Sequence, residues 1–491
     1  MPVETGAVRR ISWALFLTAL ISCAWFINGV GGPNPLSRIA LTLSLLEDRS
    51  VAVDRWVALF PDNFADKSRV GDHYYSDKAP GVSLLALPAV WLGDKLWRDV
   101  AAPRLGAKAC DVGPPSARGC EPSRVFVLTW IAGLATSALA VALAVVLLFR
   151  LALRLTGDAA GAVFAALAFG FATPALGWGT AFFGHATAAA LLLAGFAVVV
   201  LQAKPQRSPT GAGWAGLGAG LALGGAVIVE YPTLPAALVI GVLALSRLRA
   251  MSRPAAAMAA AGAVLGGLAA LLPALAYNAA AFGSPFRPGY ADVVGFEGMG
   301  SGLFGIGLPR PDIALELLAG RFRGLLWVAP VLLLAPVGAV AWWRRRLDRG
   351  VLAACLAMAA CFLAVNSGYV YWEGGDSTGP RHLTPALPFL CLLLAPLWQG
   401  ASVPIRAARS ALLAVSAVVA LACAAVDMTA PEIYQAPLTD FILPGLLAGA
   451  APKAVLSAAG FGGIAALLPL LAVWSVALVV IIRELVRLSR D

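Results

Sequence analysis

Repeated apolar runs, most of them near 20 residues, are the feature that most constrains this chain. About 20 apolar residues cross a bilayer as a helix, and a helix satisfies its own backbone hydrogen bonds in lipid. The chain of 491 residues is 60% hydrophobic and 13% charged, whereas a soluble domain is about a quarter charged. The runs expected to span are 11–30, 125–149, 158–175, 185–203, 213–230, 233–247, 255–277, 324–342, 350–367, 383–399, 409–427 and 462–482. We therefore expect an all-α polytopic membrane protein, a single integral membrane domain over residues 1–491 with about twelve transmembrane helices.

Basic residues gather in alternate connections between these runs. They are Arg9 and Arg10; Arg150 and Arg154; Lys204 and Arg207; Arg247, Arg249 and Arg253; Arg344 to Arg346 and Arg349; Arg406 and Arg409; and Arg483, Arg487 and Arg490. The positive-inside rule places such connections in the cytoplasm, so both termini are expected there. The first run lacks a small-residue cleavage site and is expected to be a retained span. No basic patch with interleaved aromatic residues appears, so nucleic acid is not an expected partner.

The segment 31–124 is expected to form one large outer loop that carries two juxtamembrane helices. The first, 35–51, has apolar residues at helical spacing while Arg38 stays on its polar side. The second, 82–97, is short and contains Pro88 and two charged residues. If it crossed the membrane, the basic connections after it would move to the outer side. We therefore expect both helices to lie on the outer membrane surface.

The seven cysteines agree with that placement. Cys110 and Cys120 flank a Pro- and Gly-rich stretch of the outer loop, where an oxidising compartment permits a disulfide; two free thiols are the alternative. The other cysteines fall in expected spans and are interpreted as packing residues: Cys23, Cys355, Cys361, Cys391 and Cys423.

Polar residues concentrate at the expected outer ends of the spans. All three histidines lie there, as do the loops 278–323 and 368–382. Ionisable groups beside apolar segments are costly and are functional candidates by default. In the second loop, Gly-rich backbone can approach an anion closely, and Arg381 offers a planar fork suited to phosphate. Purely structural roles remain for His185, as a helix cap, and for Glu230, as an interfacial residue.

Motifs of soluble enzymes are missing. The sequence has no Gly-x-x-x-x-Gly-Lys-Ser/Thr loop, no dinucleotide fingerprint, no His-Glu-x-x-His helix and no CxxC pair. An ATP-driven transporter is therefore not expected, and inverted transporter repeats are not evident either.

Two stretches resemble a known family. "YYSDKAPG" (74–81) is similar to the Tyr-x-x-Lys-Pro-Pro pattern that precedes a juxtamembrane helix in the GT-C superfamily of membrane glycosyltransferases, and "GPRHLTPALPFL" (379–390) resembles a run of its bacterial members. The nearest type is the protein mannosyltransferases and aminoarabinose transferases. The resemblance covers most of the chain. It implies a GT-C-like fold and transfer of a sugar from a polyprenyl-phosphate donor at the outer membrane face.

The resemblance also implies a donor site. Lys78 occupies the position of the family's lysine, which is expected to meet the lipid-linked phosphate. Negative charge grows on that phosphate as the anomeric C–O bond breaks, and fixed cations stabilise it. Arg381, His382 and His185 are expected to complete the phosphate site. Substrate contacts are expected from Tyr74, Tyr75, Trp372, Glu373 and Asp376.

The base that deprotonates the acceptor is less well marked. The family's aspartate after the first span aligns with Asn34, and a second acidic position is replaced by His185. We therefore expect the base in the outer loop, with Asp54 as the first candidate and Asp77, beside Lys78, as the second. The other loop aspartates weighed for this role are Asp62, Asp66 and Asp72.

These features together predict an inverting glycosyltransferase with a cell-envelope lipid, glycan or protein as acceptor. A lipid or glycolipid transporter, and an inactive GT-C-like membrane partner, are the alternatives. The partners expected are the polyprenyl-phosphate-linked sugar, membrane lipids and the acceptor; no metal or other cofactor is predicted. The Ala- and Arg-rich composition favours a bacterial plasma (inner) membrane, with the site facing the periplasm.

Overall fold

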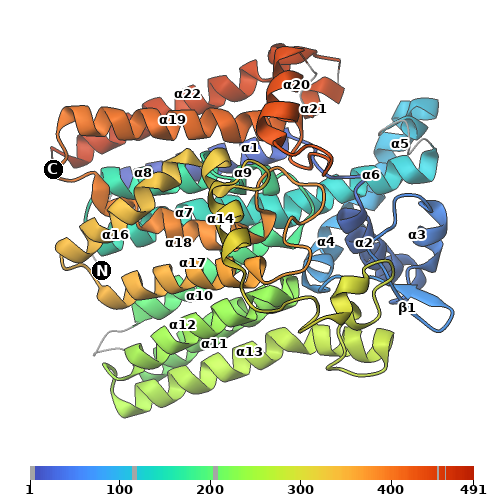
Figure 1. Cartoon of the computed structure of the whole chain (residues 1–491), viewed down its shortest axis with the longest axis horizontal. Coiled ribbons are helices and arrows are strands. Elements are labelled where there is room, and N and C mark those ends of the chain that lie inside the picture. The colour runs from blue at the N-terminus through green and yellow to red at the C-terminus, as the bar shows by residue number, and fades with distance from the viewer. Residues whose placement is uncertain (1–5, 113–118, 203–207, 450–452, 459, 491) are drawn as a thin grey trace.

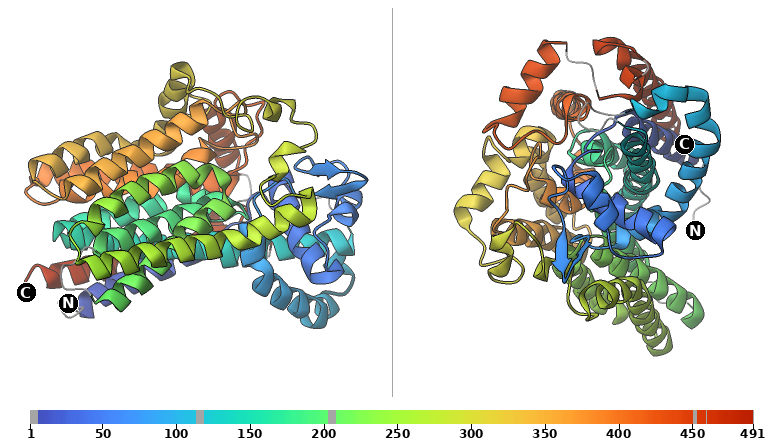
Figure 2. Two further views of the ribbon diagram at one scale, coloured as in Figure 1. Left: turned by 90° about the horizontal axis from the view of Figure 1, so that it is seen from below. Right: turned by 90° about the vertical axis from the view of Figure 1, so that its right-hand side faces the viewer.

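The computed structural model describes residues 6–112, 119–202, 208–449, 453–458 and 460–490, and these are mostly helical. Figures 1 and 2 show long helices lying side by side. At one end of this bundle lie the short helices and the two-stranded sheet of residues 33–105; α1 (Gly6–Trp25) begins and α22 (Leu468–Leu488) ends at the opposite end (Figure 1). The expected all-α membrane architecture therefore holds.

Nine helical segments among the described residues are long and apolar enough to cross a membrane. They are α1 (Gly6–Trp25), α6–α7 (Cys120–Thr156), α10 (Gly184–Gln202), α11 (Pro209–Val229), α12 with the turn before it (Tyr231–Leu248), α13 (Arg253–Phe282), α17 (Arg349–Ser367), α19 (Val403–Val426) and α22 (Leu468–Leu488). Three further expected spans coincide with shorter apolar helical segments: α8 (Ala159–Phe171), Pro330–Arg344 and Arg381–Leu397. The count of about twelve stays a prediction for those three.

Outside residues 33–105, the other helices are short and connect or cover the long ones. They are α9 (Ala175–Trp178), α14 (Pro311–Ala319), α15 (Leu325–Val328), α16 (Ala335–Arg344), α18 (Leu387–Leu392), α20 (Leu443–Leu447) and α21 (Val455–Ala458).

Small residues bring α11 and α13 into backbone contact. A Cβ atom added to Gly216 would lie 2.1 Å from the Ala259 carbonyl oxygen, and one on Gly220 would lie 2.1 Å from that of Ala263. Lipid tails are as apolar as leucine, so helices in membranes associate by close packing of this kind rather than by the hydrophobic effect.

The arginine-rich connections meet one another at the end of the bundle where α1 begins. Arg10 pairs with Glu484 at 2.8 Å, and Arg247 pairs with Asp348 at 2.6 Å. Arg345 donates to the Gln399 side chain at 2.9 Å. Connections far apart in the sequence are thus held together on one side, as the charge pattern predicts.

The opposite end holds α2 (Pro33–Leu43), α3 (Asp54–Leu59), β1 (Ser68–Val70), antiparallel β2 (His73–Tyr75), α4 (Gly81–Leu96) and α5 (Ala102–Leu105). Helices are present in both segments, 35–51 and 82–97, and their position at a membrane surface stays a prediction. Leu85 and Trp91 of α4 are about half exposed, as an interfacial helix requires. The expectation for α2 is wrong, because α2 is buried over nearly its whole length and Arg38 is 1% exposed. Arg38 turns inward because it finds polar partners there.

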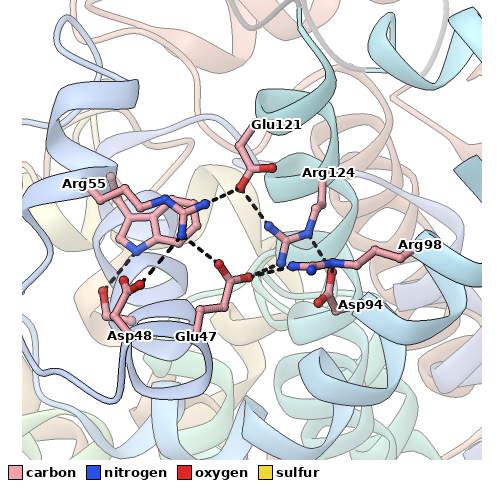
Figure 3. A network of polar contacts seen from close by, with 9 residues as sticks. Glu47, Asp48, Arg55, Asp94, Arg98, Glu121 and Arg124 are labelled. Carbon is pink, nitrogen blue, oxygen red and sulfur yellow. Dashed lines mark hydrogen bonds and ion pairs between the residues drawn. The ribbon is translucent and has the colours of Figure 1, made fainter.

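A network of ion pairs ties this region together (Figure 3). At its centre Arg124 of α6, whose side chain is 5% exposed, contacts Glu47, Asp94 and Glu121. Figure 3 also shows Arg55 and Arg98 on the outside of the same acids. These residues come from four segments, so the network fixes the juxtamembrane elements on α6.

The structure joins Cys110 to Cys120 by a disulfide, as expected. The other five cysteines are free and buried, except Cys361, which is half-buried. They are packing residues in the helices, as expected.

Candidate functional site

A polar cavity of about 490 Å³ lies where the juxtamembrane region meets the helix bundle. Its walls come from α2, the segments around Asp66 and Lys78, the start of α10, Glu230, and the loops 290–299 and 369–382. Segments separated by hundreds of residues therefore contribute to one chamber.

Lys78 lies in this wall between two carboxylates. Its Nζ atom is 3.0 Å from Asp66 Oδ2 and 2.9 Å from Asp77 Oδ2, and its side chain is 14% exposed. Burial alone would lower the pKa of Lys78, but the two carboxylates, Asp66 foremost, outweigh burial and raise it. Burial raises the pKa of Asp77, and the nearby Lys78 ammonium offsets only part of that effect.

The Lys78 segment is held by hydrogen bonds from two helices. Ser37 of α2 bonds the Ser76 hydroxyl at 2.8 Å, and Tyr277 of α13 donates to the Ser76 carbonyl oxygen at 2.6 Å. Gly289 packs so closely that an added Cβ would lie 2.8 Å from Asp77 Cα. The lysine is therefore presented on a rigid backbone.

Arg38 forms a second charged group in the cavity wall. It donates to Asn34 Oδ1 at 2.8 Å and to Glu230 Oε1 at 2.7 Å. Its third contact is the Ala79 carbonyl oxygen at 3.4 Å. The asparagine at the family's acidic position thus supports an arginine, and a carboxylate from the end of α11 balances the arginine's charge.

A third cluster has polar atoms without partners. The Nε2 atoms of His185 and His382 and the Nε atom of Arg381 are buried and make no hydrogen bond with a described residue. The two imidazole rings are perpendicular, with centroids 5.2 Å apart, and the Arg381 guanidinium lies 5.5 Å from the Phe183 ring centroid. Buried polar groups are normally hydrogen-bonded, so these three nitrogen atoms are available to a ligand.

The Gly-rich loop brings its backbone against that cluster. Gly374 and Gly375 have φ of 76° and 64°, which side chains other than glycine rarely adopt. A Cβ on Gly374 would lie 3.1 Å from Arg381 Nε and 3.2 Å from His382 Nε2. Glycine at 374 therefore leaves the space that a ligand of these groups needs.

Arg323 fixes the same loop from outside the cavity. Its side chain is fully buried and donates to the carbonyl oxygens of Glu373, at 2.8 Å, and Gly375, at 2.9 Å. Burial lowers the pKa of Arg323 to about 10. Sequence reasoning missed this residue because its partners are backbone atoms, which leave no pattern of residue types.

Two tyrosines of the cavity wall were also missed. Tyr290 and Tyr369 line the chamber, and burial raises the pKa of both hydroxyls, that of Tyr369 to about 12. Both hydroxyls therefore keep their protons at neutral pH and can donate hydrogen bonds. The only signal for them in the sequence was that both lie in loops predicted to be polar and to face outward.

No protein-family model and no curated protein matches the chain. Among solved structures it is similar to ArnT from Cupriavidus metallidurans bound to undecaprenyl phosphate, with 15% identity, a TM-score of 0.53, and coverage of 98% of this chain and 77% of that chain. For apo ArnT the values are 14%, 0.51, 98% and 74%. The AglB oligosaccharyltransferase of Archaeoglobus fulgidus gives a TM-score of only 0.44.

The chain has the fold of ArnT. ArnT is a GT-C protein, so the GT-C-like fold that the sequence resemblance implies is confirmed. At 15% identity the similarity concerns the fold alone.

Within this ArnT fold, most of the predicted site residues come together. The cavity is lined by Asp77, Lys78, His185, Glu373, Asp376, Arg381 and His382. Asp66, weighed among the loop aspartates, lines it as well. Glu230, for which a purely interfacial role was open, is a buried cavity residue.

Four predicted residues lie outside the cavity lining. Asp54 begins α3, where its carboxylate bonds His73 Nδ1 at 2.8 Å and accepts from the Tyr74 amide at 2.6 Å. Tyr75 packs on Phe282, Trp372 packs on Phe322, and the Tyr74 ring lies beside Lys67. Roles for these four in catalysis or binding remain predictions.

Metal ligation finds no support among the residues that the structure describes. No group of three or more His, Cys, Asp or Glu side chains there is placed to hold a metal ion.

Proposed function

We propose that this chain is an inverting glycosyltransferase that moves a sugar from a polyprenyl-phosphate donor to a cell-envelope acceptor. The observation that carries the proposal is Arg381, a guanidinium that makes no ion pair with a described residue and lies beside two unpartnered imidazole nitrogens. A partly buried cation without a counter-ion is costly, and a phosphate would supply the missing charge. The fold supports the proposal, because ArnT has been solved with undecaprenyl phosphate bound.

Lys78 is the second cation for the donor phosphate. The acceptor oxygen attacks the anomeric carbon as the C–O bond to phosphate breaks, and the bonding electron pair remains on the phosphate oxygen. Lys78 and Arg381 stabilise that charge, and His382 and His185 donate hydrogen bonds to it. Attack from the face opposite the leaving phosphate inverts the anomeric configuration.

Asp77 is the base that we favour for the acceptor hydroxyl. It lines the cavity, whereas Asp54 is bonded to His73 outside it. A raised pKa makes a carboxylate a stronger base, and burial raises that of Asp77. Lys78 holds Asp66 and Asp77 together, so its shift toward the phosphate would free a carboxylate to take the acceptor proton. Glu373 and Asp376 also line the cavity, where they would contact the sugar or the acceptor.

An adjoining cavity gives room for an apolar substrate portion. It measures about 910 Å³ and shares Gly29, Gly32 and Thr429 with the polar one. Its walls include Leu36 and Phe126. A donor with its head in one chamber and its tail in or beside the other would match this pairing.

The site is proposed to face the periplasm of a bacterial inner membrane, with both termini in the cytoplasm. The contacts among arginine-rich connections at the end opposite the cavity support this orientation.

Turnover by purified protein tests the function. Wild type, Lys78→Ala and the exposed-site control Lys95→Ala would be incubated with a panel of polyprenyl-phosphate sugars and an envelope lipid extract, and glycosylated products identified by mass spectrometry. We expect product from wild type and Lys95→Ala and at least tenfold less from Lys78→Ala. Donor binding without any product would favour an inactive partner. Movement of the intact glycolipid across liposomes without transfer would favour a transporter.

A further inference from the structure

A groove on the side of the helix bundle lies far from the polar cavity. It measures about 970 Å³ and is bounded by α1, α8, α19 and α22, with lining residues along α22 from Leu471 to Ser489. Leu478, Ile482 and Val486 of α22 line it and remain about half exposed. The groove is therefore open to the surroundings of the bundle along its length.

Two of the helices that border the groove, α19 and α22, are held apart. The Trp474 indole of α22 donates to Ser22 of α1 at 2.8 Å, and Glu484 pairs with Arg10 of α1. On the other side, Ser416 of α19 accepts the Val331 amide at 2.7 Å. Each helix is fixed to a different neighbour, so neither is free to close the gap.

The walls are apolar and long enough for the acyl chains of one leaflet. The lining residues of α8 run from Ala160 to Phe171 and those of α22 from Leu471 to Ser489, which is roughly 16 Å and roughly 27 Å at a rise of 1.5 Å per residue. Half of the hydrocarbon core of a bilayer measures about 15 Å. The rings of Phe164 and Trp398 pack at one end, and those of Phe171 and Trp474 pack toward the other.

One end of the groove is basic. Arg406 lies four residues before Ser410, which lines the groove, and so shares its face of α19. The Arg406 Nε atom is buried and has no hydrogen-bond partner in the described chain. Arg409 donates to the carbonyl oxygen of Leu397, next to the lining residue Trp398. Together α19 and α22 contain four arginines and one acidic residue, Glu484.

We propose that this groove binds one phospholipid with an anionic headgroup. Its acyl chains lie between α19 and α22, and its phosphate lies near Arg406 and Arg409. Basic pockets between transmembrane helices at the cytoplasmic side bind anionic lipids in this way. The inference is independent of the proposed glycosyl transfer, because the groove shares no lining residue with the polar cavity.

Native mass spectrometry of detergent-purified protein tests the groove. Delipidated protein would be titrated with dioleoyl phosphatidylglycerol or with dioleoyl phosphatidylcholine, which has the same chains. We expect one phosphatidylglycerol per chain, bound about tenfold more tightly than phosphatidylcholine. Ala414→Trp fills the groove and should abolish both, while Ala408→Trp, on an exposed face of the same helix, should leave binding unchanged.

A second variant separates charge from shape. Arg406→Gln/Arg409→Gln leaves the apolar walls intact and should bind the two lipids equally, so the proposal stays testable if Ala414→Trp fails to fold. The proposal is overturned if wild type binds neither lipid or shows no preference for phosphatidylglycerol. It is also overturned if a folded Ala414→Trp binds as wild type does, or if a co-purifying protein helix occupies the groove.

Discussion

At the scale of single residues, the cavity is defined by how its charges are partnered. Arg38 is balanced by Glu230, and Lys78 is shared by Asp66 and Asp77. Arg381 alone among these three cations has no carboxylate partner in the described structure. Removing a charge from water without a partner is costly, so the arrangement favours an anionic ligand at Arg381.

Replacing Asp77, the proposed base, should lower turnover without weakening donor binding. Asp77→Asn keeps the shape of the side chain but cannot take a proton, so turnover should fall roughly 10²- to 10⁴-fold while donor affinity stays within a few-fold. Asp54→Asn is the matched control and should retain activity, because Asp54 lies outside the cavity lining. The measurement is the initial rate at saturating donor. Loss of activity in Asp54→Asn or Asp66→Asn, with Asp77→Asn active, would assign the base elsewhere.

The two neighbouring glycines of the loop allow a second residue-scale test. Gly374→Ala and Gly375→Ala impose similar backbone strain, of about 1–3 kcal/mol, since both positions have positive φ. Only the Gly374 Cβ would approach Arg381 and His382; that of Gly375 lies 3.8 Å from its nearest neighbour, Glu432. Thermal stability should fall alike in both variants, whereas donor affinity should fall about tenfold more in Gly374→Ala. Equal affinities would argue against a ligand at this cluster.

At the scale of helices and loops, close packing and buried charge hold the architecture. The α11–α13 pair relies on glycines that let backbones touch, and the juxtamembrane helices rely on Arg124. The glycine contacts and the ion pairs both depend on which atoms each residue meets across the interface. The same substitution at a contacting and at a non-contacting position therefore tests each of them.

Gly220 and Gly218 form one such pair on α11. A Cβ on Gly220 would meet the Ala263 carbonyl oxygen at 2.1 Å, whereas one on Gly218 would meet nothing within 4 Å. Gly220→Ala should destabilise the protein by about 1–3 kcal/mol. Gly218→Ala should be neutral or stabilising by up to about 1 kcal/mol, because alanine is the better helix former. Thermal unfolding in detergent measures both, and equal effects would contradict the packing described.

Arg124 and Arg98 provide the corresponding test for the ion-pair network. Arg124→Gln leaves carboxylates facing a buried gap and should cost about 3 kcal/mol. Arg98→Gln should cost less than about 1 kcal/mol, because the Arg98 side chain is 54% exposed. The readout is the midpoint of thermal unfolding, compared at one detergent concentration. A milder effect of Arg124→Gln than of Arg98→Gln would be inconsistent with the burial assigned to Arg124.

Sequence patterns predicted where helices form better than they predicted which helices are buried. Apolar periodicity located the long helices, and the Pro/Gly-rich stretch between Cys110 and Cys120 indicated their disulfide. The burial of α2 could not be predicted, because Arg38 is stabilised by Glu230, which is 192 residues away. Residue types at the outer ends indicated Lys78 and Arg381, but the exclusion of Asp54 from the cavity depends on how β2 and α3 pack.

At the scale of the whole molecule, the chain combines an ArnT fold with two separate cavities of different chemistry. The polar cavity is lined by α2 and the Lys78 segment, and the apolar groove follows α8, α19 and α22. A polar chamber next to an apolar cavity would suit the proposed substrate, which has a charged head and an apolar tail. The fold alone does not set the chemistry, so the account depends on what the polar cavity binds.

Binding of undecaprenyl phosphate to purified protein is the most direct test of that dependence. Affinity would be measured for wild type, Lys78→Ala, Arg381→Ala and the control Lys95→Ala in the same detergent. We expect saturable binding by wild type and Lys95→Ala, and affinities at least tenfold weaker for Lys78→Ala and Arg381→Ala. Equal affinity in all four proteins, or no binding by wild type, would contradict the assignment of the cavity to a polyprenyl phosphate.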